Sequence, residues 1–152
     1  MTLEIGRFTE ADRPRWTELW RAYLGFYDTI MPRELYDHTW SRLQADQVLH
    51  AFAARHDGEI IGLTHFLYHE SGWTLRPVCY LQDLYVDPAA RTAGVGRALI
   101  EAVGAHARAR QTTRMYWLTQ DHNLPARRLY DRIAKHNGFI RYDYETTLNP
   151  AE

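Results

Sequence analysis

Two glycines, Gly94 and Gly96, lie between a strand-like run and a helix-like run, with Arg91 and Arg97 close by. The first N–H groups of a helix have no intrahelical acceptor, and the helix dipole adds partial positive charge there. Glycines at this point let an anion approach the backbone without a Cβ in the way. This stretch is therefore a candidate phosphate-binding loop, and a plain turn with two glycines is the alternative.

Two common phosphate-binding motifs do not fit the stretch. A P-loop needs Gly-Lys followed by Ser or Thr, whereas Gly96 is followed by Arg97-Ala98. A dinucleotide fingerprint needs a third glycine where Leu99 stands, and its first glycine directly follows the strand. Here the segment 87–93 intervenes between the strand and Gly94. The ligand class must therefore come from the wider sequence.

Two side chains that could transfer protons lie on either side of the glycine stretch. Asp83 precedes it on an apolar strand pattern, and Tyr130 follows it on a helical pattern. Ala126 and Tyr130 are four residues apart and therefore share one face of that helix. On this information alone, Tyr130 reads more readily as a core aromatic residue above Ile133, and Asp83 reads equally well as one half of an ion pair.

The elements that must position these groups alternate between strands and helices. Period-two or apolar patterns predict strands at 3–8, 51–55, 60–68, 78–86, 115–118 and 139–148, with a hairpin turn at Asp57-Gly58. Helical periodicity predicts helices from about Pro14 to Tyr27, from Pro32 to Leu43, over 95–110, and over 124–135, the last stopped by Asn137-Gly138. This order predicts one α/β domain over residues 1–152, with a mixed sheet.

Two motifs in the right order resemble those of the GNAT superfamily of N-acetyltransferases. Arg91-x-x-Gly94-x-Gly96, after Leu84-Tyr85-Val86-Asp87-Pro88, is similar to that family's acetyl-CoA pyrophosphate loop. The run from Asn123 through Ala126 to Tyr130, followed by Gly138-Phe139, is similar to its second motif. Details such as His69-x-Ser71-x-Trp73 resemble the histone/polyamine-type branch. The resemblance implies a mixed sheet of about six or seven strands flanked by about four helices, with strands that splay around the cofactor.

Carried over to this sequence, the resemblance implies acetyl-CoA as cosubstrate and no metal. Backbone N–H groups of the loop Arg91, Thr92, Ala93, Gly94, Val95, Gly96 and Arg97 would hold the pyrophosphate. Leu84, Tyr85 and Val86 would pair through their backbone with the pantetheine arm. Asn123 would bind pantetheine or orient its helix, and Ala126 would leave room for the cofactor. Tyr130 would be the general acid that protonates the departing thiolate.

The acceptor implied by the resemblance is a primary amine, on a polyamine, an amino-acid-like molecule or a protein lysine. An amine with a pKa near 10.4 is about one part in 10³ neutral at pH 7, so deprotonation costs about 4–5 kcal/mol. Asp83 is the best-placed base, and a water relay is the alternative. The expected acceptor pocket contains aromatic and acidic residues that would bind a cation, together with one amide, Gln82: Phe26, Tyr27, Asp28, His69, Trp73, Gln82 and Asp83.

Composition restricts the remaining function classes. The net charge of −1 does not favour nucleic acid or an anionic membrane. The single cysteine, Cys79, and the absence of a signal-like N-terminus favour a cytoplasmic protein. Cys79 lies in an apolar strand, which predicts a buried, inert thiol. His65 and His69 would be about 13 Å apart along a strand, too far to share a metal ion.

Two hypotheses remain open. The first is an N-acetyltransferase that works by direct attack in a ternary complex. The second is a CoA or acyl-CoA sensor without turnover, for which a general acid such as Tyr130 would serve no purpose. The alternating last strand over 139–148, with an exposed edge, is compatible with a homodimer.

Overall fold

A computed structural model describes residues 2–146, except for the side chains of residues 91–93. The described chain forms two compact units, divided between Trp117 and Leu118. The first unit contains β1 (Leu3–Gly6), a 3₁₀ turn η1 (Glu10–Asp12), α1 (Arg13–Phe26), α2 (Arg33–Ala45), β2 (Leu49–His56), β3 (Glu59–His69), β4 (Val78–Val86), a 3₁₀ segment η2 (Pro88–Ala93), α3 (Val95–Ala109) and β5 (Met115–Tyr116). The second contains α4 (Leu124–Ile133).

A five-stranded mixed sheet in the order β1-β2-β3-β4-β5 forms the centre of the first unit. The first four strands pair antiparallel, and β5 lies parallel to β4. The β2–β3 hairpin turns at Asp57 and Gly58, which both have positive φ angles of 50° and 86°. The sequence prediction of this hairpin is confirmed, since two successive left-handed residues match the twist of the flanking strands.

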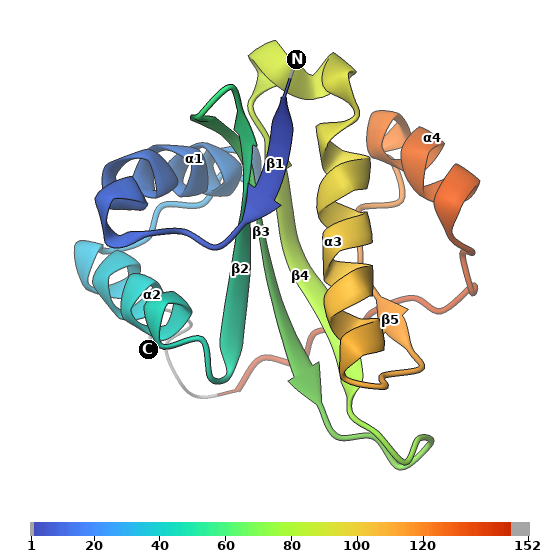
Figure 1. Ribbon diagram of the computed structural model, residues 1–152. Coiled ribbons are helices and arrows are strands. Elements are labelled where there is room, and N and C mark those ends of the chain that lie inside the picture. The colour runs from blue at the N-terminus through green and yellow to red at the C-terminus, as the bar shows by residue number, and fades with distance from the viewer. Residues whose placement is uncertain (1, 147–152) are drawn as a thin grey trace. The chain divides into compact units, whose positions relative to one another are not determined.

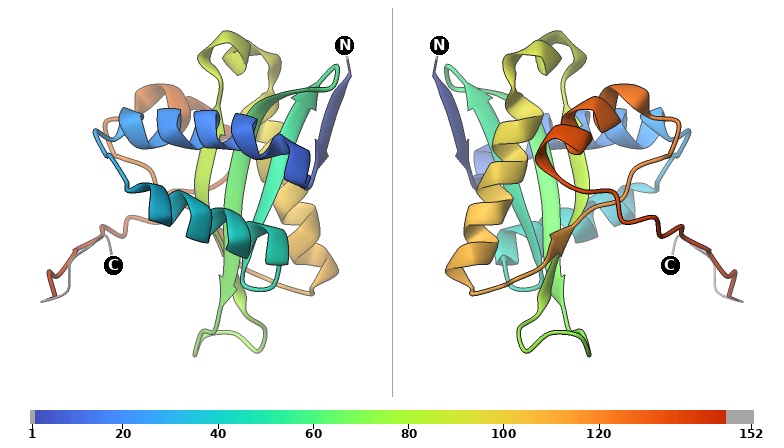
Figure 2. Two further views of the ribbon diagram at one scale, coloured as in Figure 1. Left: turned by 90° about the vertical axis from the view of Figure 1, so that its left-hand side faces the viewer. Right: turned by 90° about the vertical axis from the view of Figure 1, so that its right-hand side faces the viewer.

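Helices cover both faces of this sheet (Figure 1). Figure 2 shows α1 and α2 side by side on one face, with α3 on the other. The α1 and α2 side buries a core of Phe8, Trp16, Leu19, Trp40, Leu43, Ala51, Ala53, Ile60 and Leu63. On the α3 side, Val95 and Leu99 pack against Ala54 and Ile61. The helical periodicity of these segments thus corresponds to buried faces, although Tyr27, just after α1, is exposed.

A glycine of β3 brings the first turn of α3 close to the sheet. A Cβ on Gly62 would lie 3.1 Å from the Tyr85 carbonyl oxygen and 3.3 Å from side-chain carbons of Val95 and Leu99. Contacts this short require the neighbouring atoms to move. Gly62 thus allows the N-terminus of α3 to lie directly beside the end of β4, where the predicted phosphate loop begins.

The last predicted strand is wrong over the residues described. Residues 135–146 form neither helix nor strand, and Thr147 and Leu148 lie outside the described residues. α4 ends at Ile133, before the predicted stop at Asn137-Gly138. Phe139, Ile140, Tyr142 and Tyr144 are all exposed. An alternating pattern predicts a strand only where one face is buried and a neighbouring strand accepts its backbone hydrogen bonds. The described sheet accordingly has five strands, fewer than the predicted six or seven.

Candidate active site

The glycine loop has the backbone geometry that an anion site requires. Gly94 has φ 72° and ψ 19°, a left-handed conformation, and it caps the N-terminus of α3. The Ala98 N–H donates to the Gly94 carbonyl at 3.1 Å. By helix geometry, the N–H groups of Val95, Gly96 and Arg97 precede this bond and have no intrahelical acceptor. The Arg97 side chain pairs with Glu101 at 2.8 Å, along the helix.

Arg15, which the sequence did not single out, holds the segment before the loop in place. Asp87 caps η2 by accepting a 3.0 Å hydrogen bond from the Ala89 N–H. Arg15 of α1 donates to Asp87 at 2.9 Å and to the Ile60 carbonyl at 3.0 Å. Arg15 therefore ties α1, β3 and the end of β4 together. The side chains of Arg91, Thr92 and Ala93 lie outside the described residues, so their predicted roles stay predictions.

A bulge in β4 sets the direction of the predicted base, Asp83. His65 of β3 pairs with Asp83, but the next residue, Phe66, pairs with Leu81. Gln82 is thus the extra residue on β4. Because directly paired residues project to the same face of a sheet, this register places Asp83 beside His65. The Thr64 hydroxyl donates to the Asp83 carbonyl at 2.7 Å, which provides that backbone oxygen with a partner at the irregularity.

Asp83 belongs to a hydrogen-bonded chain that ends in the core. Its Oδ2 lies 3.1 Å from His65 Nδ1, and their side chains are 13% and 1% exposed. The indole N–H of Trp16, on α1, donates to His65 Nε2 at 3.1 Å. Trp20 also packs on the His65 ring, with centroids 4.7 Å apart. The role of His65 could not be predicted from the sequence, because its partners Trp16 and Asp83 are distant along the chain.

Tyrosines of α1 form a wall beside the carboxylate. The side chain of Tyr23 lies beside those of Asp83 and Tyr27. Burial raises the pKa of the Tyr23 phenol, and the negative charge of Asp83 raises it further. The Tyr23 ring lies 5.2 Å from Tyr27 and 6.0 Å from Tyr85, centroid to centroid. Tyr27 in turn packs edge-to-face on Phe26. A carboxylate beside aromatic rings suits a small ammonium group.

The other predicted acceptor residues are distributed more widely. His69 pairs with Val78, so it lies about 13 Å along β3 from His65, the partner of Asp83. Its Nε2 lies 2.9 Å from the Tyr116 hydroxyl. Trp73 is exposed in the β3–β4 connection, where Arg114 lies 5.5 Å from its ring. Asp28, with φ 53°, follows the end of α1. The structure brings Tyr27 and Asp83 together through Tyr23, but it leaves His69 and Trp73 near the opposite end of β4.

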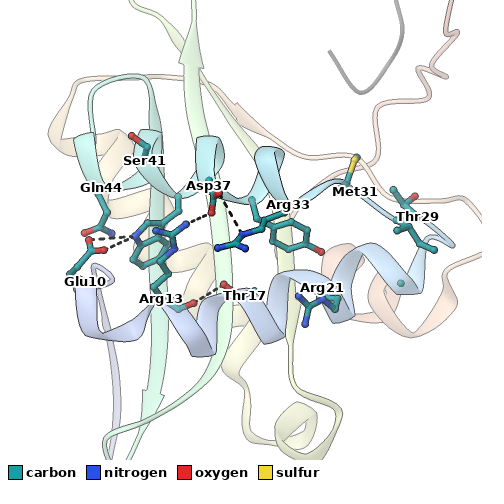
Figure 3. A pocket seen from close by; sticks show the side chains of 14 residues that line it. Glu10, Arg13, Thr17, Arg21, Thr29, Met31, Arg33, Asp37, Ser41 and Gln44 are labelled. Atoms are coloured by element: carbon teal, nitrogen blue, oxygen red, sulfur yellow. Dashed lines mark hydrogen bonds and ion pairs between the residues drawn. The ribbon is translucent and has the colours of Figure 1, made fainter.

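A surface cavity of about 1110 Å³ lies between α1 and α2 and contains none of the predicted acceptor residues (Figure 3). It opens on a different face of α1 from Tyr23. Its charges are largely satisfied locally, because Arg13 pairs with Asp37 and the Trp40 indole N–H donates to Glu10 at 3.3 Å. This cavity therefore does not supply the missing part of the predicted acceptor pocket.

The pairing of β4 with β5 ends early. Only Cys79 and Tyr80 are in register with β5, opposite Met115 and Tyr116, whereas β4 continues to Val86. The predicted pantetheine-binding residues Leu84, Tyr85 and Val86 lie beyond this short ladder, on the part of β4 that pairs with β3. The divergence agrees with the splayed strands expected from the sequence.

The second unit contains the remaining predicted residues. Asn123 caps α4, and its side-chain oxygen accepts from the Ala126 N–H at 3.4 Å. This contact shows a helix cap, and the predicted role of Asn123 toward pantetheine stays a prediction. Ala126 and Tyr130 are both partly buried, as are Leu129 and Ile133. The four residues lie on one face of α4, as helical spacing requires.

Cys79 has the character expected of an inert thiol. It is fully buried in β4, and burial raises the pKa of its thiol to about 11. The thiolate is the nucleophilic form of cysteine. Cys79 is therefore unsuited to carry an acetyl group.

Comparison with known proteins identifies the family to which this chain belongs. The model of the acetyltransferase (GNAT) family matches residues 13–135. The chain belongs to this family. It is 37% identical to the D-amino-acid N-acetyltransferase of Saccharomyces cerevisiae, over 86% of this chain and 83% of that protein. The thialysine N-epsilon-acetyltransferase of Caenorhabditis elegans is 30% identical over 63% of this chain and 61% of its own length.

The fold agrees with solved GNAT structures. The structure of AAC(6')-Iy in complex with the bisubstrate analog CoA-S-monomethyl-acetylneamine has a TM-score of 0.83 and 18% identity, and the match covers 96% of this chain and 99% of that one. The chain is thus an N-acetyltransferase of the GNAT type, and its described residues form one mixed sheet and four α-helices. Among residues 2–146, the structure contains no helix that is long and apolar enough to span a bilayer.

Proposed function

We propose that this N-acetyltransferase transfers the acetyl group of acetyl-CoA to the primary amine of a small, cationic acceptor, by direct attack within a ternary complex. The observation that carries the proposal is the position of Asp83. This carboxylate lies beside the tyrosine wall of α1 and is followed at once by the β4 residues that the family resemblance assigns to pantetheine. An ammonium group held at Asp83 would therefore lie next to a thioester bound along the end of β4.

The acceptor is proposed to be amino-acid-like. The 37% identical yeast relative is named for D-amino acids, and the nematode relative for thialysine, which are small molecules with amines. A polyamine has the same ammonium chemistry and is the nearest alternative. A protein lysine would require an open site for a peptide, and the tyrosine wall around Asp83 favours the smaller acceptor.

The loop and α4 supply the remaining groups. The N–H groups of Val95, Gly96 and Arg97 bind the pyrophosphate at the dipole of α3. The acceptor ammonium loses a proton to Asp83, directly or through water, and the neutral nitrogen attacks the thioester carbonyl carbon. The new C–N bond forms, the C–S bond breaks, and the nitrogen releases its second proton to water, as Asp83 then releases the first. Tyr130 donates a proton to the departing CoA thiolate and is reprotonated from solvent.

A panel of amines tests the activity itself. Release of CoA thiol from acetyl-CoA is measured with D- and L-amino acids, polyamines and lysine peptides, and the acetylated products are identified by mass spectrometry. We expect amine-dependent thiol release that is largest for an amino acid. Tight CoA binding without thiol release for any amine would contradict the proposal and favour a CoA sensor.

Gly94 tests the assignment of the phosphate loop. Valine at φ 72° is strained, because β-branched residues rarely adopt left-handed backbone, whereas asparagine tolerates it. We expect Gly94→Val to weaken acetyl-CoA binding by about tenfold or more, and Gly94→Asn to remain within about threefold of the original protein. The measurement is calorimetric titration with acetyl-CoA, with thermal unfolding as the folding control. An acetyl-CoA affinity of Gly94→Val equal to that of the original protein would remove this loop from the cofactor site.

Tyr130→Phe tests the general acid. Removal of the hydroxyl should lower kcat by about ten- to a thousandfold, and acetyl-CoA affinity should barely change, because the ring is retained. Steady-state kinetics and direct titration measure the two quantities. An unchanged kcat would show that Tyr130 does not protonate the thiolate.

A further inference from the structure

We propose that His65 is a positioning residue for the acceptor carboxylate: Trp16 holds its imidazole in the neutral form with the proton on Nδ1, and that N–H fixes the orientation of Asp83. The inference rests on the proposed function only in taking Asp83 as the group that binds the acceptor amine. His65 itself does not touch the substrate, since it is almost completely buried.

The tautomer follows from the hydrogen bonds of the buried chain. An indole N–H can only donate, so the 3.1 Å contact from Trp16 requires His65 Nε2 to be an acceptor. A neutral imidazole with an unprotonated Nε2 carries its proton on Nδ1. That nitrogen lies 3.1 Å from Asp83 Oδ2, where it donates to the carboxylate. Trp16 is itself fully buried and packs on Trp40, so it cannot easily turn away.

The same contacts exclude His65 as an acceptor of the proton that the substrate amine releases. Protonation of Nε2 would direct its N–H at the Trp16 N–H inside the core, with both donors cut off from water. A buried donor without an acceptor carries a large free-energy penalty. His65 therefore stays neutral and differs from the histidine of a nucleophile–histidine–acid triad, which accepts a proton during the reaction. The proton taken from the amine stays with Asp83 or passes to water.

One buried donor orients the carboxylate. His65 donates from β3, while Tyr23 of α1 lies beside the same carboxylate. An ionised carboxylate has about four acceptor positions, so the His65 donor leaves about three for an ammonium group or bridging waters. The bulge at Gln82 is what turns Asp83 toward His65. Loss of the His65 donor should let the carboxylate rotate and misplace the amine, which would lower kcat more than it weakens cofactor binding.

Nuclear magnetic resonance of the histidine rings tests the tautomer without reference to activity. The full chain is labelled with ¹⁵N, and the His65 ring signals are assigned as those lost in His65→Asn. We expect a protonated Nδ1 and an unprotonated Nε2 at neutral pH, because Nε2 must accept from Trp16. In Trp16→Phe, which removes the indole N–H, the preference for the Nδ1-protonated tautomer should be lost. A protonated Nε2 in the original protein would overturn the inference.

A pair of substitutions tests the positioning role. The side-chain NH₂ of asparagine lies near the place of His Nδ1 and can still donate to Asp83, whereas that of glutamine lies near Nε2 and faces Trp16. We expect His65→Asn to retain kcat within about threefold and His65→Gln to lower it by about thirtyfold, with an unchanged KM for acetyl-CoA in both. Thermal unfolding confirms that each variant folds. Equal losses in the two variants, or no loss in either, would overturn the positioning role.

Asp83→Asn separates this inference from the proposed function. A large drop in kcat for Asp83→Asn, together with the Asn/Gln difference at His65, supports both. A drop for Asp83→Asn without any effect of His65→Gln overturns the role of His65 and leaves the proposed function intact. An unchanged kcat in Asp83→Asn overturns the assignment of Asp83, and with it the reason to position this carboxylate.

Discussion

The hydrogen bond between His65 and Asp83 is the contact around which the candidate site is arranged. It joins two neighbouring strands at a point where β4 carries one extra residue, and it is buried on the His65 side. A buried ionisable pair is destabilising unless each polar atom has a partner. Here the Trp16 indole N–H satisfies Nε2 of the imidazole, His65 Nδ1 donates to the carboxylate, and the Thr64 hydroxyl satisfies the adjacent carbonyl. Helix α1 and the sheet must therefore fold together for the site to exist.

The phosphate loop depends on the same two elements. Arg15 extends from α1, one residue before Trp16, to Asp87 at the end of β4. Gly62, which lies on β3 three residues before His65, allows α3 to start next to that strand end. The helix that positions the acceptor carboxylate thus also holds the start of the loop. In the proposed reaction, this shared support would hold the amine and the thioester in register.

The sequence predicted those parts of the fold in which local pattern and environment agree. The bounds of β4 and the start of α3 followed from an apolar run, a proline and two glycines, and Asp83 stood out as a carboxylate in an apolar strand. The bulge at Gln82, the role of His65 and the brace from Arg15 could not be predicted, because each depends on a partner in another element. The strand expected over 139–148 shows the opposite error, since its local pattern is clear but the described residues form no ladder. His69 and Trp73 were placed in the acceptor pocket by resemblance, and strand geometry moves them away from Asp83.

Direct transfer of the acetyl group is the central claim, and it requires that no residue of the enzyme becomes acetylated. Cys79 is the chain's single cysteine, and its burial and raised pKa make an acetyl-cysteine intermediate unfavourable. Initial velocities measured over a grid of acetyl-CoA and acceptor concentrations test this most directly. The account predicts double-reciprocal lines that intersect, as in a ternary complex. Parallel lines, the pattern of a covalent acetyl-enzyme, would contradict it.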